Sequence, residues 1–85
     1  MTLQDFMVNA KQKAFELGIT DVSSVSVYAF AEFENTYYVC QIAIEEQVLR
    51  APIMHSPTSA VEAFGDAIRH YQENGNKKSN TDIVI

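Results

Sequence analysis

The chain has 85 residues, a formal net charge of -5 and 47% hydrophobic residues, which is typical of one small acidic globular domain. The acidic balance argues against a nucleic-acid backbone or an anionic membrane as partner, because both attract clustered lysine and arginine. The lone cysteine, Cys40, cannot form an intramolecular disulfide and suits a reducing compartment. No stretch reaches the roughly 20 apolar residues of a membrane span, and none has the pattern of a signal peptide. We therefore expect a cytoplasmic protein.

The first predicted element is a helix that begins near Thr2 and ends at Gly18. Thr2 can cap the helix together with Asp5, and a glycine is the usual C-terminal stop. Apolar residues recur at helical spacing, and they are Leu3, Phe6, Met7, Ala10, Ala14 and Leu17. This spacing predicts one buried stripe.

A pair of antiparallel strands is predicted next, because apolar residues alternate from position 25 to position 44. A two-residue turn at 35–36 would set Phe33 opposite Tyr38 and Val27 opposite Ile44. This register pairs apolar with apolar side chains along one face. We take that face as the inner, core-facing side of the sheet.

A third strand follows a second two-residue turn, predicted at 46–47. In this register Ile53 and His55 lie on the inner face with Tyr38. Pro52 lacks a backbone N–H group, so the third strand should be an edge strand. The sequence therefore predicts a three-stranded antiparallel meander.

The outer face of this predicted sheet is also apolar, with Glu32, Glu34 and Glu45 at its border. Aromatic residues and methionine inside a charged rim are typical of a protein interface. The candidate interface residues are Tyr28, Phe30, Tyr37, Val39, Val48 and Met54. Two other covers are possible on this evidence: a helix on each face of the sheet, or the C-terminal segment folded over it.

The second predicted helix begins at 56–59, with either Ser56 or Ser59 as its cap. Its expected end is at Asn74 and Gly75, which closes a single domain over 1–75. The predicted buried stripe consists of Ala60, Val61, Phe64, Ala67, Ile68 and Tyr71. One amphipathic face is expected to pack on the sheet.

Residues 76–85 are expected to form a polar tail that ends in three β-branched residues, Ile83, Val84 and Ile85. Such residues favour strands. The segment is therefore either a short edge strand or loosely docked tail of its own subunit, or an interaction motif that adds a strand to a neighbour.

The order of helix, meander and helix, over about Thr2 to Gly75, resembles the topology of the double-stranded RNA-binding domain. The resemblance implies an α+β fold (α-β-β-β-α) with both helices on one sheet face. In that family the start of the second helix carries lysines that grip phosphates, whereas residues 56–61 here read SPTSAV. We expect no direct nucleic-acid binding by this mode, and no site residue is carried over from the family.

No catalytic, cofactor or metal site is predicted. Cys40 and His55 lie on different cross-strand pairs of the expected sheet, with no inward carboxylate beside them. Asp66 and His70 share a helix face, which predicts an exposed ion pair, because no nucleophile is placed beside them. The three glycines of the chain are isolated, so no glycine-rich phosphate loop exists.

These observations favour a non-enzymatic protein interaction module whose partner is another copy of the chain. The expected homodimer forms through the outer sheet face or through edge strands. One alternative is an acidic inhibitor or accessory protein of a nucleic-acid-handling protein, suggested by the net charge of -5. A further alternative is a small ligand-binding protein or enzyme, which would need a polar pocket between helices and sheet.

Overall fold

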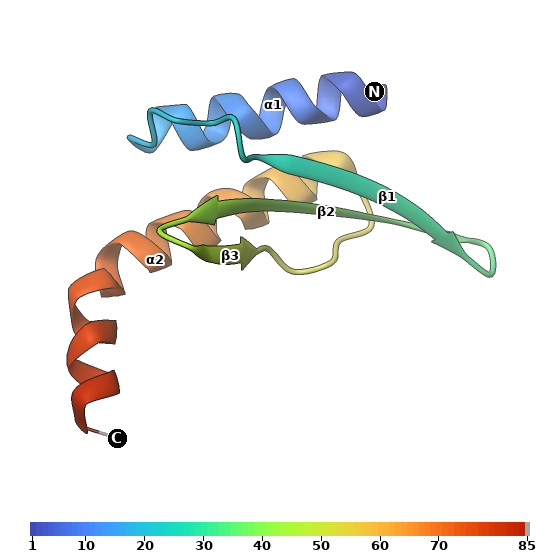
Figure 1. The fold of residues 1–85 in the computed structure, drawn as a ribbon. Coiled ribbons are helices and arrows are strands. Elements are labelled where there is room, and N and C mark those ends of the chain that lie inside the picture. Colours follow the sequence, from blue (N-terminus) through green and yellow to red (C-terminus); the bar gives the residue numbers. More distant parts are fainter. Residues whose placement is uncertain (85) are drawn as a thin grey trace.

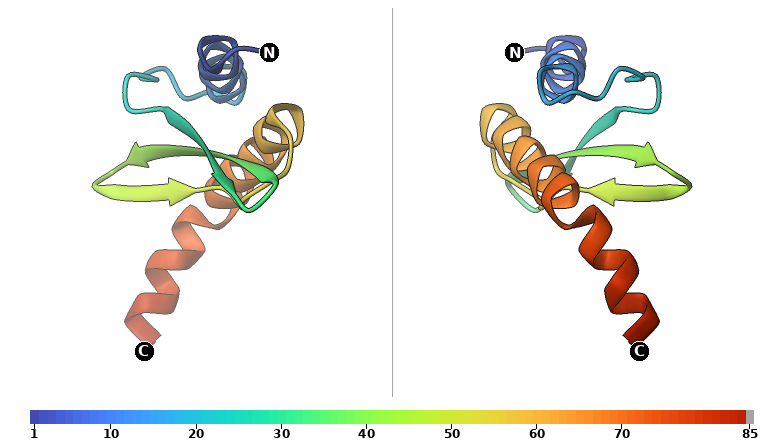
Figure 2. Two further views of the ribbon diagram at one scale, coloured as in Figure 1. Left: turned by 90° about the vertical axis from the view of Figure 1, so that its right-hand side faces the viewer. Right: turned by 90° about the vertical axis from the view of Figure 1, so that its left-hand side faces the viewer.

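The computed structural model describes the backbone of residues 1–84 and the side chains of residues 1–74. The element order is α1 (Leu3–Glu16), β1 (Ser26–Glu32), β2 (Asn35–Ile44), β3 (Gln47–Arg50) and α2 (Pro57–Val84). The strands form one antiparallel sheet in the order β1-β2-β3 (Figure 1). Both helices contact the sheet, and they also contact each other (Figure 2). The predicted α+β order with a meander sheet is confirmed.

Helix α1 begins and ends where its capping residues predict. The Asp5 N–H donates to Thr2 Oγ1 at 3.0 Å, and the Thr2 N–H donates to Asp5 Oδ2 at 3.3 Å. This reciprocal pair is a capping box. At the other end Gly18 has a φ of +95°, a conformation that glycine adopts without a steric penalty.

Helix α2 starts at the first of the two possible caps and continues beyond its predicted end. The Ser59 N–H donates to Ser56 Oγ at 3.1 Å, which leaves Pro57 as the first helical residue. The predicted stop at Asn74 and Gly75 is wrong, since the helix runs on to Val84. A lone glycine costs a helix only about 1 kcal/mol, and no proline follows it.

The segment predicted as a polar tail, 76–85, is therefore helical as far as Val84. Ile83 and Val84 belong to α2, whereas Ile85 and every side chain from Gly75 onwards lie outside the described residues. The edge-strand or interaction role expected of these three terminal residues stays a prediction.

The first hairpin uses a different turn from the predicted one. Its turn lies at 33–34 rather than 35–36, so Phe30 lies opposite Tyr37 and Val27 lies opposite Cys40. Because the change in pairing is an even number of residues, each side chain keeps its predicted face. The predicted register would have set Phe30 opposite Gln41, whereas the observed one gives a cross-strand aromatic pair.

The second turn also differs, and it lies at 45–46 rather than 46–47. Glu45 and Glu46 have φ values of 50° and 69°. Positive φ at both central residues is the pattern of a type I′ turn, which matches the twist of the two strands. Ile42 consequently lies opposite Leu49, while the faces of β3 stay as predicted.

An extra residue after β3 reverses the faces of the segment that follows. The Ala51 N–H donates to the Cys40 carbonyl at 3.0 Å, but the next paired residues are Tyr38 and Met54. Three steps along one chain therefore oppose two steps along the other, which is a β-bulge. The bulge contains Pro52, which has no N–H to continue the ladder.

This bulge overturns three predicted positions. Met54, predicted on the outer face, packs against the core. Ile53, predicted inside, is 55% exposed. His55, also predicted inside, contacts the ring of Tyr37 on the outer face. The reversal follows from the two-residue period of a strand, because one inserted residue turns every later side chain to the other face.

The core lies between the helices and the inner face of the sheet. Phe6 of α1, Phe64 of α2 and Ile42 of β2 are at most 1% exposed and belong to one buried cluster. Tyr38 packs edge-on against Phe6, with ring centroids 5.7 Å apart. The even-numbered residues of β2 thus form the inner face, as predicted, and the odd-numbered residues form the outer one.

Candidate functional site

A row of four rings crosses the outer face of the sheet. Tyr28 stacks on Phe30 with ring centroids 6.3 Å apart, and Phe30 stacks on Tyr37 at 5.1 Å. The imidazole of His55 continues the series, with its centroid 5.0 Å from that of Tyr37. We call these four residues the aromatic row. It draws on β1, on β2 and on the segment that follows β3.

Local sequence and strand pairing together build this row. Tyr28 and Phe30 are two positions apart, so they project from the same face of β1. The hairpin register then sets Tyr37 opposite Phe30, and the bulge turns His55 to the same side. Tyr28 is 38% exposed and Phe30 is 36% exposed. The row is therefore accessible to a partner.

The other predicted interface residues have different surroundings. Val39 lies opposite Tyr28 on the outer face but is fully buried, outside the core that the helices share. Val48 of β3 is 61% exposed and lies opposite Ala43. Met54 belongs to the core side. Of the six predicted interface residues, Tyr28, Phe30 and Tyr37 belong to the aromatic row. Val39 is buried beneath the outer face, Val48 is exposed apart from the row, and Met54 packs in the core.

Sequence reasoning misplaced three residues that are exposed in the structure. His55 and Ile53 were assigned to the inner face, although Pro52 was a signal that the ladder could be interrupted there. Phe33, predicted opposite Tyr38, lies in the turn between β1 and β2 and is 94% exposed. Its φ is 59°, a conformation that is uncommon for a bulky residue. The sequence has no glycine there to indicate such a turn.

The end of the first hairpin projects beyond both helices (Figure 1). Residues 28–36 are all exposed, on both faces of the two strands. Glu32 and Glu34 lie at this end, so its rim is acidic. An uncovered two-stranded hairpin is only marginally stable in water, and further strands or a packed surface stabilise it.

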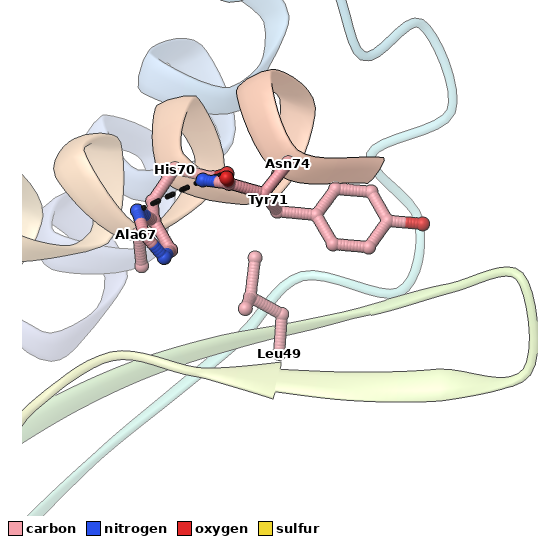
Figure 3. A pocket seen from close by; sticks show the side chains of 5 residues that line it. All are labelled: Leu49, Ala67, His70, Tyr71 and Asn74. Carbon is pink, nitrogen blue, oxygen red and sulfur yellow. Dashed lines mark hydrogen bonds between the residues drawn. The ribbon is translucent and has the colours of Figure 1, made fainter. Parts of the chain in front are cut away.

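A separate pocket lies between α2 and β3 (Figure 3). It has a volume of about 280 Å³ and is lined by Leu49, Ala67, His70, Tyr71 and Asn74. The Asn74 side-chain nitrogen lies 3.2 Å from Nδ1 of His70. The pocket is mainly apolar, and its lining includes no serine, threonine or cysteine nucleophile.

Two polar contacts of α2 involve Tyr71 and Asp66. The Tyr71 hydroxyl donates to Glu45 Oε2 at 3.1 Å. Burial, together with this hydrogen bond and the negative charge of Glu45, raises the pKa of Tyr71. Asp66 forms an ion pair with Arg69 at 2.7 Å. The predicted Asp66–His70 ion pair is therefore wrong, because the Asp66 carboxylate pairs with Arg69 instead.

The cysteine is part of the core. Cys40 is fully buried, and this burial raises the pKa of its thiol to about 12. A thiol of this kind is a poor nucleophile, because the thiolate is the reactive form. Among the described residues, no three His, Cys, Asp or Glu side chains are grouped so that they could hold a metal ion.

Comparisons with known proteins add no family assignment. No family model, no curated protein and no solved structure matches this chain. Within the described part of the chain, no helix combines the length and the apolar character required to cross a membrane. The geometry of the outer face is consequently the main evidence for function.

Proposed function

We propose that this chain is a non-enzymatic protein interaction module that binds a second copy of itself through the outer sheet face and the adjoining strand edge. The observation that carries this proposal is the aromatic row, in which four rings are in contact on a face that the helices leave open. Aromatic residues are enriched in the cores of protein interfaces and supply much of their binding energy.

The border of the face supports a protein partner. Glu32 and Glu34 at the hairpin end and Arg50 on β3 are exposed, which gives an apolar centre with a charged rim. The Arg50 Nε donates to Gln41 Oε1 at 3.0 Å. This arrangement matches the usual division of an interface into an apolar core and a polar rim.

The alternative functions rest on weaker features. An acidic inhibitor of a nucleic-acid-handling protein would use the net charge of -5, and its binding would weaken steeply with salt. A double-stranded-RNA-binding mode would need the topology of that domain together with lysines at the start of α2, and residues 56–61 carry none. A ligand-binding role would use the pocket beside Tyr71, which His55 and Tyr38 do not line.

Sedimentation equilibrium at micromolar concentration tests self-association. We expect a monomer–dimer equilibrium for the natural chain and a monomer for Phe30→Glu, because a charge in the row would be desolvated on binding. Phe15→Glu is the matched control, since Phe15 lies on α1 and is 62% exposed. Circular dichroism should show an unchanged fold for both variants. A clean monomer for the natural chain would contradict the proposal.

A further inference from the structure

We infer that two copies join through the edge of β1, so that two three-stranded sheets become one continuous antiparallel sheet with a two-fold axis beside Ala29. This inference rests on the self-association proposed above and specifies where it occurs. The occupant of the edge is the β1 strand of a second copy, and not an unrelated peptide. Three properties of β1 favour this pairing: its composition, the direction of its free backbone groups and its self-complementary register.

The edge of β1 lacks the features that normally prevent strand addition. The strand runs from Ser26 to Glu32 at one side of the sheet. It contains no proline and no lysine, and its only charge is at its last residue. Exposed edges of monomeric proteins usually carry such residues or are covered. The net charge of -5 makes two copies repel each other, so a shared seam should be uncharged, as 26–31 is.

The opposite edge is protected by comparison. β3 has four residues, ends in Arg50 and is followed by Pro52 within the bulge. A short strand, a charge and a proline each disfavour pairing with another chain. The two free edges of the sheet are therefore unequal, and β1 is the one suited to a partner strand.

The direction of the free backbone groups follows from the turn at 33–34. In a two-residue turn the residues on either side, here Glu32 and Asn35, form a hydrogen-bonded pair. Such pairs alternate along an antiparallel ladder. The N–H and C=O groups of Val27, Ala29 and Ala31 consequently point away from β2. They are the groups that a second strand would use.

One register satisfies all of these groups at once. Placing Ala29 opposite its own copy sets Val27 opposite the second copy's Ala31, and each of these pairs can exchange two hydrogen bonds. A shift towards one end of the strand brings in Phe33, which lies in the turn. A shift towards the other end brings in Val25, whose N–H already donates to the Val22 carbonyl. The central register therefore uses the edge most completely.

The same register is favourable for the side chains. It sets Tyr28 opposite the second copy's Phe30, which joins the two aromatic rows across the axis. It sets Glu32 opposite Ser26, so that no two glutamates of the seam face each other. Like charges placed directly opposite would destabilise the pair.

The inner side of the edge has room for the added strand. A groove of about 370 Å³ lies where α1 meets β1, lined by Leu3, Gln4, Met7 and Val27. Leu3 is 56% exposed. The second copy's Ala31 would lie beside Val27 in this groove, and its small side chain allows the strand to pass along α1. Backbone pairing beside an apolar groove is the usual geometry of strand addition.

Ala29→Pro provides the first test, with Val48→Pro as its matched control on the opposite edge. Proline removes one N–H group that points away from β2, so the monomer keeps its ladder. We expect Ala29→Pro to weaken the dimer by at least about tenfold in sedimentation equilibrium, since it loses paired hydrogen bonds and adds a clash. We expect Val48→Pro to dimerise like the natural chain, because Val48 lies outside the aromatic row and on the edge opposite β1. The reverse result would assign the dimer to β3 and overturn the inference.

A cysteine at the axis provides a second test that does not require proline to be tolerated. Hydrogen-bonded antiparallel partners have Cα atoms about 5.5 Å apart, within the range of a disulfide. Under mild oxidation, Ala29→Cys should form a covalent dimer at least tenfold faster than Val48→Cys. Cys40 is buried and does not compete. A dimer of the natural chain without selective Ala29→Cys cross-linking would overturn the β1 seam alone, whereas a monomeric natural chain would overturn the proposed function as well.

Discussion

The imidazole of His55 packs against the ring of Tyr37, with centroids 5.0 Å apart and planes inclined by 48°. This contact exists because the bulge at Pro52 inserts one residue opposite β2. Without the insertion His55 would lie on the helix-covered side of the sheet. The one-residue bulge therefore places His55 beside Tyr37 and completes the aromatic row.

The Tyr37–His55 contact should be measurable by a double-mutant cycle. Urea denaturation of Tyr37→Leu, His55→Ala and the double variant should give a coupling energy of about 0.5–1.5 kcal/mol, the range found for aromatic pairs. The matched cycle pairs Tyr37→Leu with His70→Ala, because His70 lies at the α2 pocket. That cycle should be additive. Equal coupling in both cycles would show that the contact is not specific.

Cys40 should be unreactive in the folded protein. With a pKa of about 12, the Cys40 thiol stays protonated at pH 8. Labelling by a disulfide reagent should therefore depend on the unfolding that exposes the thiol, and it should accelerate in urea. Rapid labelling in native buffer would contradict the buried position.

The same thiol should make stability depend on pH. Its folded pKa is raised above the usual value of about 8.5, so its contribution to stability is complete below that value and declines towards about pH 12. As the pH rises, the Cys40 thiol loses its proton in the unfolded chain before it does so in the folded one. The free energy of unfolding should therefore fall above about pH 9, and it should fall less steeply in Cys40→Ala. Parallel pH profiles for the two proteins would contradict this assignment.

Glu46→Gly should stabilise the protein. Glu46 has a φ of 69°, which strains a residue with a side chain, whereas glycine adopts it freely. We expect the free energy of unfolding to rise by about 0.5–1 kcal/mol after the larger unfolded-state entropy of glycine is subtracted. Glu34→Gly is the control, because Glu34 lies in the other turn without a positive φ. That variant should give no gain in urea denaturation.

Glu45→Gln should lower the pKa of Tyr71. The pKa of this phenol is raised by burial and by the hydrogen bond and charge of Glu45, and the substitution removes the charge. Carbon-13 NMR of the labelled tyrosine ring would follow the titration. Glu46→Gln, in the same turn, should leave it unchanged. In the natural chain this raised pKa makes Tyr71 favour folding below about pH 10 and lose that contribution as the phenol ionises.

Local sequence patterns were enough to predict most of the helices and strands. Thr2 with Asp5 and Gly18 marked both ends of α1, because a capping box and a left-handed glycine depend on neighbouring residues alone. The inner face of β2 was also predictable, since strand alternation survives any even change of register. Gly75 misled the prediction for α2, because a glycine weakens a helix without obliging it to end.

The exact pairings depended on contacts between distant residues. Several even-numbered shifts match apolar with apolar residues in the hairpin, and the stacking of Phe30 on Tyr37 is present only when the strands are paired as observed. Phe33 and Glu46 have positive φ because the pairing of the strands requires these turns, although their side chains do not favour the conformation.

The sequence by itself determined an acidic α+β domain whose sheet is apolar on both faces, because composition and alternation are properties of the chain alone. The tertiary structure decided which outer residues are available: it buried Val39, moved Met54 to the core and brought His55 to the row. The positions of Met54 and His55 both depend on one unpaired step beside Pro52. A strand with period two converts that step into a change of face for every residue that follows.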